Sequence, residues 1–282
     1  TVETEADWIN TDDLTGGPGT AGAVTRAVWQ YFASYAPYWL EKTGLPAGRP
    51  LGEQTTKGID GLRADFGQGM PPQFWEYCIN VARSRKWSFV FMTESLDGGK
   101  VTYRSNRHFD ILNENIVPNW QNAADTAAHR SIFEARRSAY GQGLVLLNNT
   151  SHDELPYADP WQAFIRYAVG GTIDGAPMIM YGQEIGTGQK NGIETTPQGS
   201  FDFYELNFGK FIPHFKRWNS MQPQWTAWQN NSLGVRNLFP AYSGVGKARE
   251  FSAALRSSNR WYLNPAGSND PDPNIFAVAK YE

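Results

Sequence analysis

Short apolar runs alternate with helix-like patterns along most of this 282-residue chain, and this alternation strongly limits its possible folds. The runs that predict strands are 58–65, 88–92, 109–112, 143–147 and 176–181. Most of them are apolar at nearly every position, which is typical of strands covered on both faces in a parallel sheet. The segments that predict helices are 21–35, 71–82, 121–139 and 160–169. Such strand–helix alternation favours an α/β fold.

The two ends of the predicted fold differ from this middle. The first helix places Val24, Val28, Tyr31, Phe32 and Tyr35 at spacings of three and four residues, so it has a single apolar face. Proline at position 37 should stop or kink that helix. Near the other end, residues 249–256 are predicted to be part of a last helix, which is followed by strand-like runs at 261–263 and 275–279. These runs predict the beginning of a β domain.

Acidic residues stand at the ends of three predicted strands. Asp65 and Glu94 end the first two, and His152-Asp153 follow the fourth. In open and barrel α/β folds, chemistry takes place beyond the carboxyl ends of the strands. Arg63 lies two residues before Asp65 and points to the same side of its strand, where its guanidinium favours the ionised carboxylate. We therefore expect the functional site at this edge of the sheet.

A pair of carboxylates at adjacent strand ends suits the hydrolysis of glycosides. A retaining glycosidase needs an ionised nucleophile and a protonated acid about 5–5.5 Å apart. Neighbouring strands lie about 4.8 Å apart, so two strand ends can supply that separation. Asp65 and Glu94 end consecutive predicted strands and are the candidate pair.

Four segments, in this order, resemble those of the α-amylase family, glycoside hydrolase family 13. They are GLRAD (61–65), FVFMTE (89–94), SHD (151–153) and GAPMIMYGQE (175–184). The resemblance implies a (β/α)8 TIM-type barrel, of which this chain holds about strands 4–8, followed by the start of an antiparallel β domain. On that basis the barrel portion covers 1–257 and the β domain begins in 258–282.

The resemblance also assigns roles to the site residues. It implies that Asp65 is the nucleophile, that Glu94 is the general acid and then the general base, and that Asp153 stabilises the transition state. Arg63 would orient Asp65, and His152 would hydrogen-bond the sugar. The implied activity is retaining hydrolysis of α-glucosidic bonds in starch- or glycogen-type glucans. An α-glucanotransferase with the same three carboxylates, or a non-catalytic carbohydrate-binding relative, are the alternatives.

The chain departs from the family pattern in several places. The family's motif on the third strand is not recognisable, and half a barrel would leave strand edges unpaired. We therefore expect the N-terminal half of the barrel as a missing segment or a separate chain. The Lys-His pair common after the nucleophile is replaced by Gln68-Gly69, which puts classical endo-amylase specificity in doubt. Ser151 and Thr93 replace a usual Asn and Gly.

Composition limits the remaining possibilities. A formal net charge of −3 argues against a nucleic-acid partner, and no apolar run is long enough to predict a membrane span. Cys78 is the one cysteine and is expected to be a buried apolar residue, and the four histidines follow no zinc-binding spacing. The chemistry requires no cofactor; the family resemblance implies that structural calcium is possible, without indicating ligands. Trp120 and Trp161 are each expected to be either core residues or sugar-stacking subsite residues.

Overall fold

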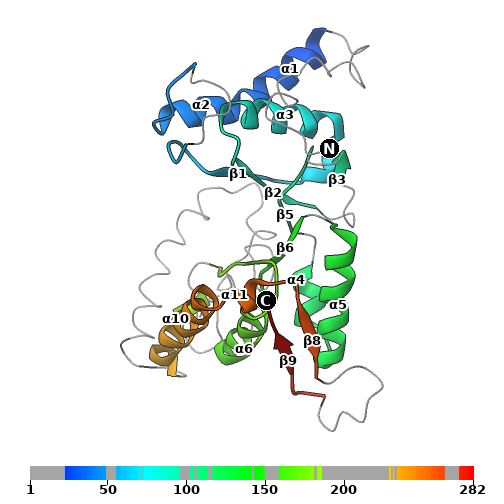
Figure 1. Cartoon of the computed structure of the whole chain (residues 1–282), viewed down its shortest axis with the longest axis vertical. Coiled ribbons are helices and arrows are strands. Elements are labelled where there is room, and N and C mark those ends of the chain that lie inside the picture. Colours follow the sequence, from blue (N-terminus) through cyan, green and yellow to red (C-terminus); the bar gives the residue numbers. More distant parts are fainter. Residues whose placement is uncertain are drawn as a thin grey trace, which may run out of the picture. The chain divides into compact units, whose positions relative to one another are not determined.

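The computed structural model describes most of the chain in two compact units. It covers 23–48, 55–70, 72–95, 102–104, 107–113, 116–141, 143–149, 159–180, 183–185, 229, 231, 234–263 and 273–282. The first unit comprises Thr1–Glu114 with Arg136–Val145, and the second comprises Asn115–Ala135 with Leu146–Glu282. Figure 1 labels helices and strands of the two units.

The predicted strands form parallel pairs in the order β1-β2-β5-β6-β7. Their bounds are β1 (Gly61–Ala64), β2 (Val90–Glu94), β5 (Ile111–Asn113), β6 (Leu144–Leu147) and β7 (Ala176–Pro177). The beginning of β6 pairs with β5, and its last two residues pair with β7. Phe91, Leu112 and Val145 are each at most 3% exposed, as expected for strands covered by helices, whereas Val90 and Leu144 at the start of β2 and β6 are 37% and 42% exposed. The α/β class predicted from the sequence is confirmed, although β7 ends earlier than the predicted strand 176–181.

The helices of the first unit lie along one side of β1 and β2 (Figure 1). They are α1 (Ala23–Ala33), α2 (Tyr35–Lys42) and α3 (Pro72–Arg85). The helix predicted over 21–35 is divided at Ser34, and Pro37 lies in the first turn of α2. α1 ends at Ala33, whose carbonyl would accept the N–H that proline at position 37 lacks, so the predicted interruption by Pro37 is observed. Proline is tolerated there because a first-turn N–H has no intrahelical acceptor.

The core of the first unit uses a different face of α1 from the one predicted. Trp29 and Ala33 pack on Phe74 and Cys78 of α3, whereas the predicted apolar face (Val24, Val28, Tyr31, Phe32 and Tyr35) is 43–78% exposed. The prediction of Cys78 as a buried apolar residue is confirmed, and burial raises the pKa of its thiol to about 12. The exposed face includes three aromatic side chains, those of Tyr31, Phe32 and Tyr35.

Ion pairs hold the amino ends of the strands in the first unit. The Lys86 side chain is 2% exposed, and its Nζ donates to Asp60 Oδ1 at 2.6 Å, just before β1. Arg83 donates to both oxygens of Asp110 at 2.7 and 2.8 Å, just before β5. Asp110 Oδ2 also accepts from the Phe91 N–H of β2 at 2.7 Å. These contacts secure one end of the sheet and leave the carboxyl ends for other groups.

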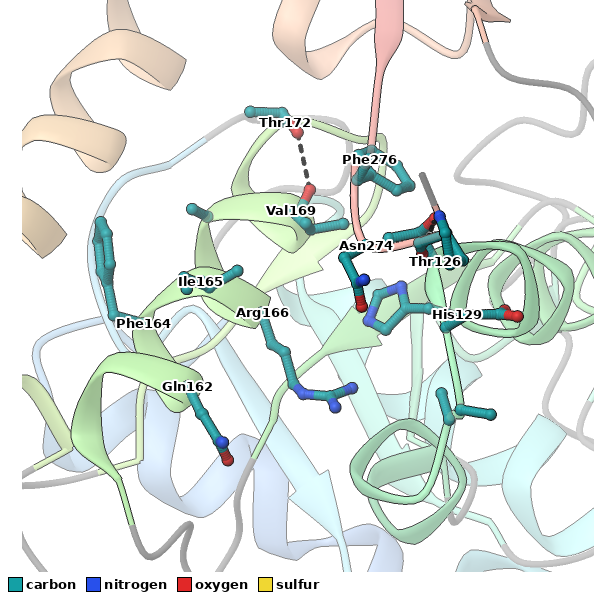
Figure 2. Close-up of a pocket in the computed structure, with 15 residues that line it drawn as sticks. Thr126, His129, Gln162, Phe164, Ile165, Arg166, Val169, Thr172, Asn274 and Phe276 are labelled. Carbon is teal, nitrogen blue, oxygen red and sulfur yellow. Dashed lines mark hydrogen bonds between the residues drawn. The ribbon is translucent and has the colours of Figure 1, made fainter. Parts of the chain in front are cut away.

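The second unit contains the predicted helices, with changed boundaries for some of them, and one helix, over 116–121, that was not predicted. They are α4 (Ile116–Gln121), α5 (Thr126–Ala139, of which the last four residues belong to the first unit), α6 (Pro160–Gly171), α10 (Val235–Phe251) and α11 (Ala253–Arg256). α5 begins five residues later than the predicted helix 121–139 because Asp125 caps it, its Oδ1 accepting from the Ala128 N–H at 2.7 Å. α6 begins as predicted, with Asp159 as N-cap and Pro160 in the first turn. Residues of α5, α6 and the 273–276 segment surround a cavity of about 570 Å³ (Figure 2).

The predicted helical segment 249–256 comprises the end of α10 and all of α11, and α10 begins 14 residues before that segment, at Val235. Its interior holds Pro240 and two glycines, which disfavour helix in a sequence pattern. Tertiary contacts override that preference, because Leu238 and Tyr242 pack on Tyr167 of α6 in a buried cluster. Arg249 adds three hydrogen bonds to carbonyls at the end of α6 and beyond, those of Gly171, Ile173 and Gly175, at 2.7–3.1 Å.

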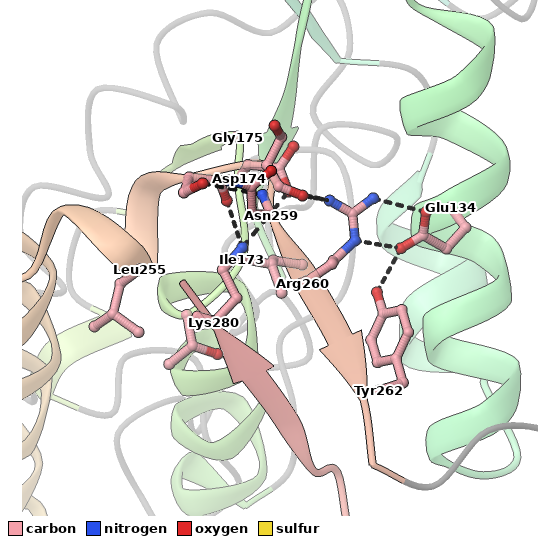
Figure 3. Close-up of polar contacts among 12 residues, drawn as sticks. Glu134, Ile173, Asp174, Gly175, Leu255, Asn259, Arg260, Tyr262 and Lys280 are labelled. Carbon is pink, nitrogen blue, oxygen red and sulfur yellow. Dashed lines mark hydrogen bonds and ion pairs between the residues drawn. The ribbon is translucent and has the colours of Figure 1, made fainter. Parts of the chain in front are cut away.

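A network of charged groups attaches the C-terminal strands to α5 (Figure 3). β8 (Arg260–Tyr262) and β9 (Val278–Lys280) pair antiparallel, close to the two predicted strand runs. Arg260 donates to both oxygens of Glu134 and to Asp174 Oδ1, each at 2.7 Å. The Tyr262 hydroxyl donates to the same Glu134, and hydrogen bonding to Glu134 is the main cause that raises the pKa of Arg260. A further antiparallel pair, β3 (Thr102–Arg104) with β4 (Arg107–His108), was not predicted.

Candidate functional site

The predicted site lies where β1 and β2 end side by side. Their register pairs Arg63 with Met92 and Ala64 with Thr93. One more step along both strands places Asp65 opposite Glu94. The prediction that these two carboxylates end adjacent parallel strands is therefore confirmed.

Arg63 joins the two carboxylates. Its Nη1 donates to Asp65 Oδ1 at 2.7 Å, and its Nη2 donates to Glu94 Oε2 at 3.1 Å. The Asp65 side chain is 78% exposed, whereas Glu94 is 18% exposed. One guanidinium thus holds an open carboxylate and a recessed one at the same strand edge.

The backbone after Asp65 also contacts Glu94. The Phe66 N–H donates to Glu94 Oε2 at 3.2 Å, and Phe66 has a left-handed backbone with φ 49°. The 3-10 turn η4 (Gly67–Gly69) follows and is closed by the Gly69 N–H on the Phe66 carbonyl. A Cβ at position 67 would lie 1.8 Å from Thr93 Oγ1, so only glycine allows this close approach. The glycines at 67 and 69 are the sequence signal for this tight turn.

Asn113 is a strand-end residue that sequence reasoning missed. It ends β5 and pairs with Glu94 in the β2–β5 register, so it is next to the carboxylates in the sheet. Its Oδ1 is buried and has no hydrogen-bond partner among the described residues. The signal was its position directly after the apolar pair Ile111-Leu112. An amide there can hydrogen-bond a ligand placed over the strand ends.

The structure describes only some of the other predicted site residues. His152 and Asp153 lie outside the described residues, so their roles stay predictions. Trp120 is fully buried and stacks on His129, with ring centroids 4.6 Å apart, so it is a core residue. Trp161 packs edge-on against Phe164 and is half-buried.

Neither a metal site nor a membrane span is found in the described part of the chain. Across those ranges, no three His, Cys, Asp or Glu side chains group closely enough to hold an ion. No calcium ligand is assigned among the described residues. None of the described helices has the length and hydropathy required to cross a bilayer.

Comparison with solved structures identifies the fold. A cyclic α-maltosyl-(1→6)-maltose hydrolase from Arthrobacter globiformis superposes with TM-score 0.57 at 16% identity, over 86% of this chain and 48% of its own. An α-amylase from Geobacillus thermoleovorans, complexed with acarbose, superposes with TM-score 0.58 at 14% identity, over 93% and 51%. The type III pullulan hydrolase from Thermococcus kodakarensis superposes with TM-score 0.57 at 15% identity, over 93% and 41%.

These neighbours show the fold of the chain and no more. No family model and no curated protein matches the sequence. The chain spans about half the length of the solved structures it matches. It has the fold of α-amylase-family enzymes over that part, as the resemblance of the four segments predicted.

Proposed function

We propose that this chain is the catalytic portion of a retaining glycoside hydrolase that cleaves α-glucosidic bonds in starch- or glycogen-type glucans. The observation that carries the proposal is the Arg63-bridged pair of carboxylates at the ends of β1 and β2. The named activities of the neighbours, on cyclic maltosyl-maltose and pullulan and as α-amylases, support an α-glucan as the substrate.

Asp65 is the proposed nucleophile. Its carboxylate is open to an incoming sugar, and Arg63 stabilises its charge and fixes its orientation through the 2.7 Å contact. Attack on the anomeric carbon forms a covalent glycosyl–enzyme bond as the glycosidic oxygen leaves.

Glu94 is the proposed acid and base. It is recessed, and within the described residues both of its hydrogen bonds reach the same oxygen, Oε2. This leaves Oε1 for the leaving oxygen in the first step and for the attacking water in the second. In the first step Glu94 gives its proton to the leaving sugar, and in the second it takes a proton from water. The water adds to the carbon that Asp65 releases.

Asp153 and His152 are assigned by resemblance. Asp153 would hydrogen-bond sugar hydroxyls and stabilise the oxocarbenium-like transition state, and His152 would hydrogen-bond the same sugar. Asn113, next to Glu94 in the sheet, is a further candidate contact for the substrate.

A transferase is the second candidate, favoured by the residues after the nucleophile. Gln68 and Gly69 occupy the turn η4 at the site edge, in place of the Lys-His pair common in amylases. If that change alters binding on the leaving-group side, a sugar hydroxyl could compete with water for the same intermediate. No cofactor is required for either outcome, and any role of calcium would be structural.

We also propose that the first half of a barrel completes this fold, either as a further segment or as a separate chain. β1 is an edge strand, which pairs only with β2 among the described strands. Beside it, a cavity of about 180 Å³ lies between β1 and the first helices, and Phe32 and Tyr35 line it. An added parallel strand would pair with β1 and place apolar side chains there.

The test is a product assay with maltooligosaccharides and soluble starch, followed by NMR. We expect α-anomeric first products, with longer oligosaccharides only if transfer occurs. Asp65→Asn and Glu94→Gln should each lose at least about 10³-fold in turnover, since each removes a group that acts in the reaction. Asp153→Asn should lose most of the activity. Glu250→Gln, on the exposed side of α10, is the matched control and should keep full activity.

Several outcomes would refute the proposal. Near-normal activity in Asp65→Asn or Glu94→Gln would remove the assigned roles. β-anomeric first products would exclude a retaining mechanism on α-linkages. If the chain is inert alone, the assay is repeated with the first half of a related barrel supplied. Continued inactivity of a complex that forms would favour the non-catalytic alternative.

A further inference from the structure

The second unit contains a cavity that the proposed mechanism does not use. It measures about 570 Å³, within the range of small-ligand sites, and every residue that lines it belongs to the second unit. Asp65 and Glu94 belong to the first unit. Figure 2 shows Arg166 of α6, His129 of α5 and Asn274 extending toward a common region from three different segments.

The charged residues of this cavity are already engaged. Asp125 caps α5 by accepting from the Ala128 N–H, and Arg166 donates to the Trp120 carbonyl. Burial, and then the neighbouring Arg166, lowers the pKa of His129 to about 4, so its imidazole is neutral at pH 7. The formal charges of Asp125 and Arg166 also sum to zero. The cavity therefore favours a neutral ligand over an ion.

The remaining lining combines apolar surface with hydrogen-bonding groups. Ile165 is 60% exposed on α6, and Phe276 forms part of the wall from the C-terminal segment. Gln162 and Asn274 supply exposed amides. The buried His129 Nε2 has no hydrogen-bond partner among the described residues, although its ring lines the cavity. A ligand with apolar ring faces and hydroxyl edges matches this combination.

We infer that this cavity is a second carbohydrate site, which binds a neutral oligosaccharide of α-linked glucose units. The choice of glucose units rests on the proposed function; the neutral, hydroxylated character follows from the lining residues. The site would hold glucan without cleaving it, because none of the residues in its wall forms a carboxylate pair. Binding there would keep a long glucan on the protein between catalytic events.

The test uses maltotriose as the probe and the full chain with Asp65→Asn to prevent turnover. Affinity is measured by calorimetry, and the His129 ring signals, assigned with His129→Gln, are followed by NMR. We expect a saturable shift of the His129 signals. Gln162→Ala/Ile165→Ala removes an exposed amide and an exposed apolar contact and should weaken binding at least about tenfold. Gln30→Ala/Val28→Ala truncates an exposed amide and an exposed β-branched side chain on α1 and should leave the affinity unchanged.

Each result decides for or against the inference. Equal affinity in both double variants, or binding without movement of the His129 signals, would overturn it, as would no binding of maltotriose. Equal binding of lactose would overturn the preference for α-linked glucose. Failure of the proposed function is distinguishable: binding at the cavity with no hydrolysis by the unsubstituted chain refutes only the catalytic proposal. Hydrolysis with unmoved His129 signals refutes only this second site.

Discussion

Arg260 should be a main source of stability in the second unit, and replacing it tests the buried charge network. Its side chain is 13% exposed and contacts Asp174, which is 6% exposed, and Glu134, which is 38% exposed. Arg260→Met keeps a long apolar stem but removes the 2.7 Å contact with Asp174, which among the described ion pairs then retains the one with Lys280 at 3.9 Å. Removing one partner of a buried ion pair costs about 3–5 kcal/mol.

The expected loss follows from weighing the two carboxylates separately. Asp174 is deeply buried but keeps a contact with Lys280. The loss of unfolding free energy from its broken pair with Arg260 is therefore taken at the lower end of that range, at about 3 kcal/mol. Glu134 is more than a third exposed, so solvent screening reduces its share to about 1 kcal/mol or less. The total, about 3–4 kcal/mol, corresponds to a fall in Tm of roughly 6–16 °C for a unit of this size.

Thermal and urea unfolding measure this loss against a matched control. Arg256→Met removes an exposed arginine that donates only to backbone carbonyls among the described contacts, and it should cost about 1 kcal/mol or less. In Asp174→Asn/Arg260→Met the buried charge is gone, so the loss should be at least about 2 kcal/mol smaller than the sum of the single variants. The reasoning is refuted if Arg260→Met costs no more than Arg256→Met, or if the double variant is additive.

Three further predictions concern other positions. His129 has its folded pKa lowered from 6.5 to about 4, so it supports folding fully above pH 6.5 and loses that support as pH falls toward 4. When the pH falls from 7 to 4, the unfolding free energy of the native chain should therefore fall by up to about 3 kcal/mol more than that of His129→Gln. Equal pH profiles of the two chains would contradict this. Burial raises the pKa of the Cys78 thiol to about 12, so little thiolate is present at pH 8. The folded chain should therefore react with Ellman's reagent at least about 100-fold more slowly than the chain unfolded in guanidinium. Rapid labelling of the folded chain would show that α3 is not packed as described. Gly67→Ala forces a methyl group onto Thr93 Oγ1 and should cost about 1–3 kcal/mol by urea unfolding, whereas Gly244→Ala, with open space around its Cβ position, should be neutral or slightly stabilising.

The sequence alone predicted the sheet and part of the site. Parallel strands buried on both faces are apolar throughout, so residues 88–92 and 143–147 were recognisable without knowledge of their neighbours. Arg63 and Asp65 are two residues apart, and the period of a strand puts them on one side, as the 2.7 Å contact confirms. Glu94 could be paired with them because consecutive parallel strands end at the same edge.

Helix boundaries and faces depended on contacts that a local pattern does not contain. Helix α10 includes Pro240 and persists because Leu238 and Tyr242 pack on α6. The face of α1 with the best apolar spacing is exposed, and Trp29 is buried instead, because burial depends on where α3 lies and not on spacing alone.

The tertiary structure alone determined the contacts between residues distant in the chain. Asn113 lies beside Glu94 because β5 pairs with β2, and the apolar pair before position 113 indicates the end of a strand but not which residue lies opposite it. Arg260 reaches Glu134 across 126 positions, and the cavity beside His129 combines α5, α6 and the C-terminal segment. The sequence determines which chemical groups and which local periods are present. Distances between groups far apart in the chain are set by packing, so only the folded structure decides which of those groups act together.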